Sequence, residues 1–206
     1  MSDTELAEAV APRKRPKPGE RRVQILQALA TMLEQPGTER ITTASLAARL
    51  DVSEAALYRH FASKAQMFEG LIEFIEQSVF SLVNQIVAQS DPAVDGARQA
   101  SRIVSVLLQF GEKNPGMTRV MVGDALVFEN ERLQQRMNLF FDKIESTLRQ
   151  CLRAAAGDSD TPTVDAQVRA SVLASFVAGR LQRFVRSGFT RLPTEYLEGS
   201  LRSLLA

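Results

Sequence analysis

The amino-acid sequence predicts an all-α protein in which a small three-helix domain precedes a larger helical bundle. Apolar residues recur at spacings of three and four along most of the chain, and Pro or Gly separates these periodic segments. No stretch alternates polar and apolar residues for more than a few positions, so we expect no sheet. The chain has 206 residues, 45% hydrophobic and 24% charged, which is enough to bury a core. We expect three segments: an arm (1–19), the three-helix domain (20–66) and the bundle (67–206).

Composition excludes several classes of function. The single cysteine, Cys151, and the single histidine, His60, exclude most metal sites and most histidine-dependent catalysis. The sequence also has no glycine-rich phosphate loop, so we predict a protein that is not an enzyme and uses no cofactor and no metal. No apolar run approaches the ~20 residues that cross a bilayer, and no secretory signal is visible. We therefore expect a cytoplasmic protein with no membrane partner.

Charge is distributed unevenly, although the net charge is only +1. Residues 1–12 carry three acids and no base, residues 13–64 carry ten Lys/Arg against five Asp/Glu, and residues 65–206 carry fifteen against sixteen. A basic segment joined to a nearly neutral remainder is typical of a nucleic-acid reader on a larger body, and a soluble basic surface is the alternative.

The Pro-rich arm is predicted to be disordered. A basic cluster spans the end of the arm and the residues after it: Arg13, Lys14, Arg15, Lys17, Arg21 and Arg22. Two interpretations of this cluster are open, because such residues either lie along DNA phosphates or act as a solubilising tail.

Each element of the three-helix domain has a local signal. The first helix is predicted to begin near Glu20, to end before Pro36-Gly37 and to bury Val23, Leu26, Leu29, Ala30 and Leu33. Hydroxyl side chains, which favour the position before a helix, precede the next three helices: Thr42-Thr43 before 44–50, Ser53 before 54–60, and Ser63 before a long helix that begins at Lys64.

Residues 43–61 follow the pattern of a helix-turn-helix. Two short helices cross steeply, so their contact needs a small residue, Ala47, and their turn needs a residue that tolerates positive φ, Asp51. The expected miniature core is Leu46, Leu50, Val52, Leu57 and Phe61. The second helix of this motif enters the DNA major groove. The predicted DNA-binding residues are Glu54, Ala55, Tyr58 and Arg59 on that helix, Thr42, Thr43, Ser45 and Ser53 at helix starts, and His60 and Lys64 just beyond.

The long helix from Lys64 is predicted to bury a stripe of apolar residues on one face: Phe68, Leu71, Ile75, Val79, Leu82 and Ile86. Phe74 lies about 120° from the centre of this stripe at 100° per residue. Either Phe74 packs on a second face of the helix or it remains partly exposed.

Four more helices complete the expected bundle: 94–113, 124–155, 164–187 and a short one after Pro193, with an acidic loop over 157–162. Asn114-Pro115-Gly116 is expected to end the first of these. Cys151 continues an apolar repeat in the second, so we interpret it as a buried small hydrophobic residue. Gly179 lies within a helix, where glycine is about 1 kcal/mol less favourable than alanine, so we expect another helix to approach closely there.

The residues Ile41-Thr42-Thr43, Leu57-Tyr58-Arg59-His60-Phe61 and Ser63-Lys64 resemble the DNA-binding domain of the TetR family of bacterial regulators. The resemblance implies about nine helices, a homodimer, and phosphate contacts by Tyr58, His60 and Lys64. In the family, two long helices from each subunit form a four-helix interface. We place this interface within 124–187, with Phe176, Gly179, Arg183 and Phe184 as its residues. Two-fold symmetry then implies a palindromic site on double-stranded DNA.

Blocks outside this motif resemble one group within the family, the nucleoid occlusion factors: Leu71-Ile72-Glu73-Phe74-Ile75-Glu76, Phe110-Gly111-Glu112-Lys113-Asn114-Pro115-Gly116 and Arg183-Phe184-Val185-Arg186-Ser187. This resemblance implies a nucleoid-associated dimer that, when bound to DNA, antagonises FtsZ ring assembly and prevents septation over the nucleoid. The implied FtsZ contacts are Phe74, Val106, Gln109, Lys113 and Asn114. Three of these positions, 106, 109 and 113, carry Leu, Gly and Arg in enterobacterial members. For Phe74 the resemblance favours a partner contact over packing.

A ligand-responsive transcriptional repressor is the alternative within the family. Its small-molecule pocket would be lined by Phe110, Met117, Met121, Phe128, Met137 and Phe140. Such residues at helical spacing are more typical of a plain core, so we expect no small-molecule ligand.

Overall fold

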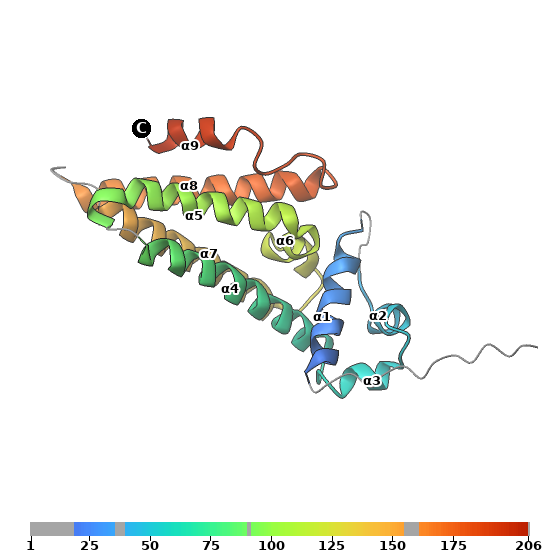
Figure 1. Ribbon diagram of the computed structural model, residues 1–206. Coiled ribbons are helices and arrows are strands. Elements are labelled where there is room, and N and C mark those ends of the chain that lie inside the picture. Colours follow the sequence, from blue (N-terminus) through green and yellow to red (C-terminus); the bar gives the residue numbers. More distant parts are fainter. Residues whose placement is uncertain (1–18, 36–39, 90–91, 155–160, 206) are drawn as a thin grey trace, which may run out of the picture.

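The computed structural model describes residues 19–35, 40–89, 92–154 and 161–205. In these residues the chain forms nine α-helices, one short 3₁₀ helix and no strand, which confirms the predicted all-α fold (Figure 1). The elements are α1 (Glu20–Leu33), α2 (Thr43–Arg49), α3 (Glu54–Tyr58), α4 (Lys64–Ala88), α5 (Pro92–Lys113), α6 (Pro115–Met121), η1 (Asp124–Leu126), α7 (Glu131–Ala154), α8 (Pro162–Arg186) and α9 (Leu197–Leu205). Nearly all of the predicted arm, Pro36-Gly37 and most of the predicted acidic loop lie outside the described residues.

Two parts of the molecule are visible in Figure 1. Helices α1, α2 and α3 gather at one end and are called the head, whereas α5 to α9 form the body. Helix α4 belongs to both, because it begins beside α3 and continues along the body without a break across the predicted boundary at residue 66.

Helix α1 buries Ile25, Leu29 and Leu33, which repeat every four residues. The predicted burial of Val23 is wrong, because its side chain is 53% exposed. Val23 lies two residues from Ile25, or about 200° around the helix, which turns it to the solvent side.

The helix-turn-helix forms as predicted, with Leu46, Ala47, Leu57 and Phe61 buried where α2 and α3 cross. The turn residue Asp51 has φ of 54°, in the left-handed region that short polar side chains tolerate. Helix α3 ends at Tyr58, earlier than the predicted end at residue 60.

Helix α4 buries most of its predicted stripe, with one correction. Leu82 is 41% exposed, and Val83 is buried instead, because the step from Val79 to the next buried position is four residues. Phe74 is 47% exposed, so its ring is not packed on a second face. Among the described helices, α4 alone is long and apolar enough to cross a membrane by length and composition. In this fold, however, its apolar stripe faces the core.

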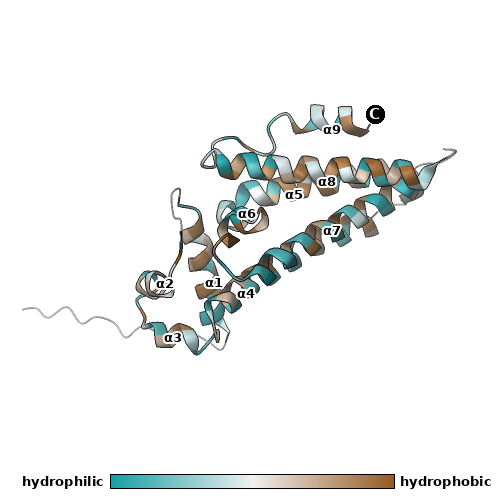
Figure 2. Cartoon of the chain, turned by 180° about the vertical axis from the view of Figure 1, so that it is seen from behind, coloured by the Kyte–Doolittle hydropathy of each residue, from teal (hydrophilic) through white to brown (hydrophobic). Residues whose placement is uncertain are grey.

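The body is a bundle in which α5, α7 and α8 run lengthwise and α9 lies outside α5 and α8 (Figure 1). Figure 2 shows hydrophobic residues recurring between hydrophilic ones along α4, α7 and α8. Cys151 is buried as predicted, and its burial raises the pKa of the thiol above the ordinary value.

The segment between α5 and α7 differs from the prediction of one helix over 124–155. Pro115 begins an additional helix, α6, because proline fits the first turn, whose N–H groups have no helical partner. Gly123, at φ of 80°, follows α6 and leads into η1. Helix α7 begins only at Glu131, after Asn130 accepts a hydrogen bond from the Arg132 N–H at 3.1 Å.

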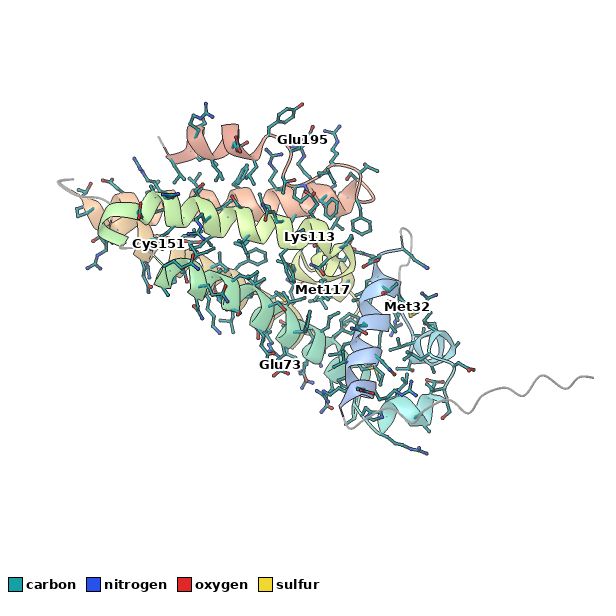
Figure 3. The ribbon with its side chains drawn as sticks, viewed as in Figure 1. Met32, Glu73, Lys113, Met117, Cys151 and Glu195 are labelled. Atoms are coloured by element: carbon teal, nitrogen blue, oxygen red, sulfur yellow. The ribbon has the colours of Figure 1, made fainter. Side chains whose placement is uncertain are left out.

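Helix α6 fixes the body to the head at a very close contact. A Cβ atom on Gly116 would lie 2.0 Å from the backbone oxygen of Ala30 in α1, so only glycine fits. Arg119 donates from Nη1 to the Leu33 carbonyl at 3.3 Å and from Nε to Asp124 at 2.6 Å. Figure 3 shows Met117 of α6 and Met32 of α1 at the same junction.

Ion pairs join α4 to the first half of α7. Arg136 contacts Glu76 at 2.6 Å, and Arg132 contacts Glu69 at 2.8 Å. The hydrogen bond to Glu76 raises the pKa of Arg136 above its ordinary value. These pairs and the α1–α6 contact hold the head at a defined position relative to the body.

Candidate nucleic-acid interface

The start of α2 is a capping box formed by Thr42 and Ser45. The Thr42 hydroxyl accepts from the Ser45 N–H at 3.1 Å, and the Ser45 hydroxyl accepts from the Thr42 N–H at 3.1 Å. Both hydroxyls therefore satisfy backbone groups at the helix start, which fixes the direction of α2. Both residues are exposed on the part of the head where DNA binding is predicted.

The start of α3 is capped by Ser53, whose hydroxyl accepts from the Ala56 N–H at 3.3 Å. Glu54 and Ala55 follow and are both exposed, as contact with DNA would require. The burial of Leu57 on the opposite face fixes which side of this short helix points outward.

A chain of hydrogen bonds connects α2 to α3 on this outer surface. The Thr43 hydroxyl donates to the Glu54 carboxylate at 2.5 Å, and the Tyr58 hydroxyl donates to the Thr43 oxygen at 3.5 Å. Tyr58 is 45% exposed, so its hydroxyl is held in place and still accessible. The Glu54 carboxylate thus orients the Thr43 hydroxyl, a role that was not predicted for it.

Arg22, in the first turn of α1, contacts the end of the helix-turn-helix. Its Nη1 donates to the His60 carbonyl at 3.0 Å, and its guanidinium lies 4.1 Å from the centre of the Phe61 ring. Arg22 was predicted only as a member of the basic cluster, and no local signal indicated this contact. The side chains of Arg59 and His60 are exposed.

Lys64 lies at the first position of α4, but its ammonium group is not free. It forms an ion pair with Glu129, in the segment between η1 and α7, and it lies 5.6 Å from the centre of the Phe68 ring. The structure thus gives this predicted phosphate contact a partner from the body.

The predicted FtsZ contacts lie on α4 and at the end of α5. Phe74, Gln109 and Lys113 are exposed, whereas Val106 and Asn114 are half-buried. The Asn114 side chain donates to the Phe110 carbonyl at 2.8 Å. Figure 3 labels Glu73, the neighbour of Phe74, on the outer side of α4 and Lys113 at the end of α5.

The outer face of α8 carries an apolar stripe that the sequence analysis missed. Val164, Val168 and Val172 are 60%, 58% and 44% exposed, and they continue at helical spacing into the half-buried Phe176 and the exposed Gly179 and Arg183. A Cβ atom on Gly179 would meet nothing within 4 Å in this chain. The signal for this stripe is the 4-4-4-3-4 spacing of the six residues.

Phe184 was predicted at the dimer interface, and this assignment is corrected. Its side chain is 1% exposed and packs edge-on against Phe189 at 5.2 Å, so it belongs to the interior of one chain.

The six residues expected to line a small-molecule pocket differ in their exposure. Phe128 is 67% exposed, whereas Met121, Met137 and Phe140 are buried in the core. Phe140 packs edge-on against both Phe80 and Phe141, as a core residue does.

Comparisons with known proteins show which families and relatives this chain resembles. Residues 25–71 match the family described as bacterial regulatory proteins, tetR family, and residues 95–205 match the SlmA-like family described as tetracyclin repressor-like, C-terminal domain. The chain is 51% identical over 177 residues to the nucleoid occlusion factor SlmA of Idiomarina loihiensis, covering 85% of this chain and 89% of the relative. It is 52% identical over 176 residues to the SlmA of Vibrio cholerae, covering 84% and 88%. A TetR-family transcriptional regulator from Bordetella parapertussis has a similar fold, with a TM-score of 0.71 at 16% identity over 91% and 95% of the two chains.

Proposed function

We propose that this chain, which belongs to the TetR family of bacterial regulators and to its SlmA-type nucleoid occlusion factors, prevents septation over the nucleoid. In this proposal a homodimer binds palindromic chromosomal sites and, once bound, antagonises assembly of the FtsZ ring. The observation that carries the proposal is the combination of an exposed reading helix in the head with an exposed phenylalanine on α4.

DNA binding follows from membership of the family, and the geometry of the head supports the residues that we assign to it. Tyr58, which donates a hydrogen bond to Thr43, offers a hydroxyl for a phosphate, and the next two residues, Arg59 and His60, add exposed basic side chains. Since phosphate contacts release counterions, we expect the affinity to fall steeply with salt concentration.

The homodimer is proposed from the outer face of α8. Three valines left largely in water at i, i+4 and i+8 form a face that a second copy would cover, and Gly179 would let the two helices approach closely. Phe176, Gly179 and Arg183 are retained as interface residues, and Val164, Val168 and Val172 are added to them.

The FtsZ surface is proposed from Phe74 together with the end of α5. A phenylalanine that is 47% exposed on α4 supplies an apolar group, and Gln109 and Lys113 supply exposed polar side chains on α5. An aromatic anchor with a polar rim is the common composition of a protein-binding site.

Light scattering by polymerising FtsZ tests the proposal. The protein is added with a DNA duplex that carries its binding site, with a scrambled duplex, and without DNA. We expect the specific duplex to give the strongest loss of scattering. Equal inhibition in all three mixtures, or no inhibition in any, contradicts the proposal.

Phe74→Ala tests the surface, with Leu192→Ala as its matched control, because Leu192 is also 47% exposed but lies between α8 and α9. The expected result is that Phe74→Ala abolishes inhibition of FtsZ while DNA affinity is retained, and that Leu192→Ala behaves like the unchanged protein. If Phe74→Ala inhibits FtsZ fully, Phe74 is not a contact.

A further inference from the structure

The ion pair between Lys64 and Glu129 joins a residue of the reading motif to a residue of the body. The side chains are 20% and 10% exposed, so this pair is more shielded from water than an ordinary surface pair. The two residues are 65 positions apart in the sequence and meet because the segment before α7 lies beside the first turn of α4 (Figure 1).

This contact bears on DNA binding because Lys64 is one of the side chains that the proposed function places at a DNA phosphate. A lysine held against a carboxylate must exchange that partner for the phosphate or share its ammonium group between two negative charges. Either way, the carboxylate opposes the phosphate, since an ion pair has to be broken or two like charges brought close together.

We propose that Glu129 is an affinity-setting residue of the DNA site: it lowers the affinity of the head for DNA by holding Lys64 away from the phosphate. This inference rests on the proposed role of Lys64 in DNA binding. It assigns to the segment before α7 a direct influence on DNA affinity, although that segment lies outside the reading motif.

Other contacts keep the head in place when Glu129 loses its charge. Glu69 and Glu76 still pair with Arg132 and Arg136, and Gly116 still lies against Ala30. Removal of the carboxylate therefore frees Lys64 without releasing α4 from the body.

The first test compares Glu129→Gln with the unchanged protein by fluorescence anisotropy on a duplex that carries the binding site. Glu131→Gln is the matched control, because Glu131 is exposed, lies two residues away and forms no ion pair in the described part of the chain. Both variants remove one negative charge from the same segment. We expect Glu129→Gln to bind about three- to tenfold more tightly, the scale of one partly shielded ion pair, and Glu131→Gln to change affinity less than about twofold. Equal affinity of the two variants overturns the proposal, and so does weaker binding by Glu129→Gln, which would mean that the carboxylate positions Lys64 for DNA.

The second test is a double-mutant cycle with Lys64→Met, which separates this inference from the proposed DNA site. If Lys64 contacts a phosphate, Lys64→Met binds more weakly and the salt dependence of log K falls by about one unit. In that background Glu129→Gln should no longer change the affinity, because the lysine that it releases is absent. Unchanged affinity of Lys64→Met contradicts the phosphate contact itself. A full effect of Glu129→Gln without Lys64 leaves the phosphate contact intact but refutes the link between the two residues.

Discussion

Gly116→Ala should weaken the junction between head and body. The added Cβ would lie 2.0 Å from the Ala30 oxygen and 3.0 Å from the Ala30 carbonyl carbon, both backbone atoms that cannot rotate away. Helices α1 and α6 must therefore separate by about 1 Å, and overpacking of this kind costs about 1–3 kcal/mol. Alanine also restricts the unfolded chain, which offsets about 0.4–1 kcal/mol. The expected net loss is about 1.3 kcal/mol, or about 3–5 °C in Tm for a chain of this size.

Thermal unfolding followed by circular dichroism measures this change. Gly199→Ala in α9 is the control, because its Cβ would meet nothing within 4 Å and alanine favours the helix. We expect the control to unfold at the same temperature as the unchanged protein or slightly above it. A Gly116→Ala variant that also keeps its Tm would refute the argument that backbone contact fixes the head.

Four further predictions concern Tyr58, the apolar stripe on α8 and Cys151. Tyr58→Phe should weaken DNA binding by about 1 kcal/mol, the scale of one hydrogen bond, and an unchanged titration would remove Tyr58 from the site. Gly179→Leu should raise the dimer dissociation constant at least about tenfold, equivalent to about 1.4 kcal/mol, and sedimentation that shows an intact dimer would contradict the α8 interface. Cys151 should react with a disulfide reagent about two orders of magnitude more slowly in native protein than in urea, because burial removes access and raises its pKa. The raised pKa of Cys151 also predicts that the free energy of unfolding decreases as pH rises above about 8.5, the pKa of the thiol in the unfolded chain. Alkaline denaturation of Cys151→Ser checks this prediction, because the variant should lack that decrease.

Local chemistry predicted much of the head. Ser53 and Ser63 each cap the helix that they were expected to cap, and Asp51 takes the positive φ that the turn requires. Of the two threonines expected before the second helix, Thr42 is the cap and Thr43 is the first helical residue. These features depend on residues within four positions of one another, so a single sequence contains the information that determines them.

Features that depend on distant residues were missed. Asn114-Pro115-Gly116 ends α5 as predicted, but the sequence did not show that Pro115 also begins α6 or that Gly116 is required by Ala30, far away in the sequence. In the same way, nothing near Lys64 indicates Glu129. The burial of Phe184, by contrast, could have been predicted, because Phe184 continues the spacing of Leu173, Val177 and Leu181 on the buried face of α8. Periodicity identifies an apolar face but not which neighbour covers it, and so the valines of α8 remained unassigned.

If the proposed dimer forms through α8, the valines on its outer face tie the oligomeric state of this protein to its copy number. The valines are exposed to solvent in a single chain and would be buried only when two chains associate. Because association depends on concentration, dilution as a cell grows would shift the population toward monomers. Two adjacent half-sites on a chromosome would oppose that dilution, because each holds one chain within reach of the other.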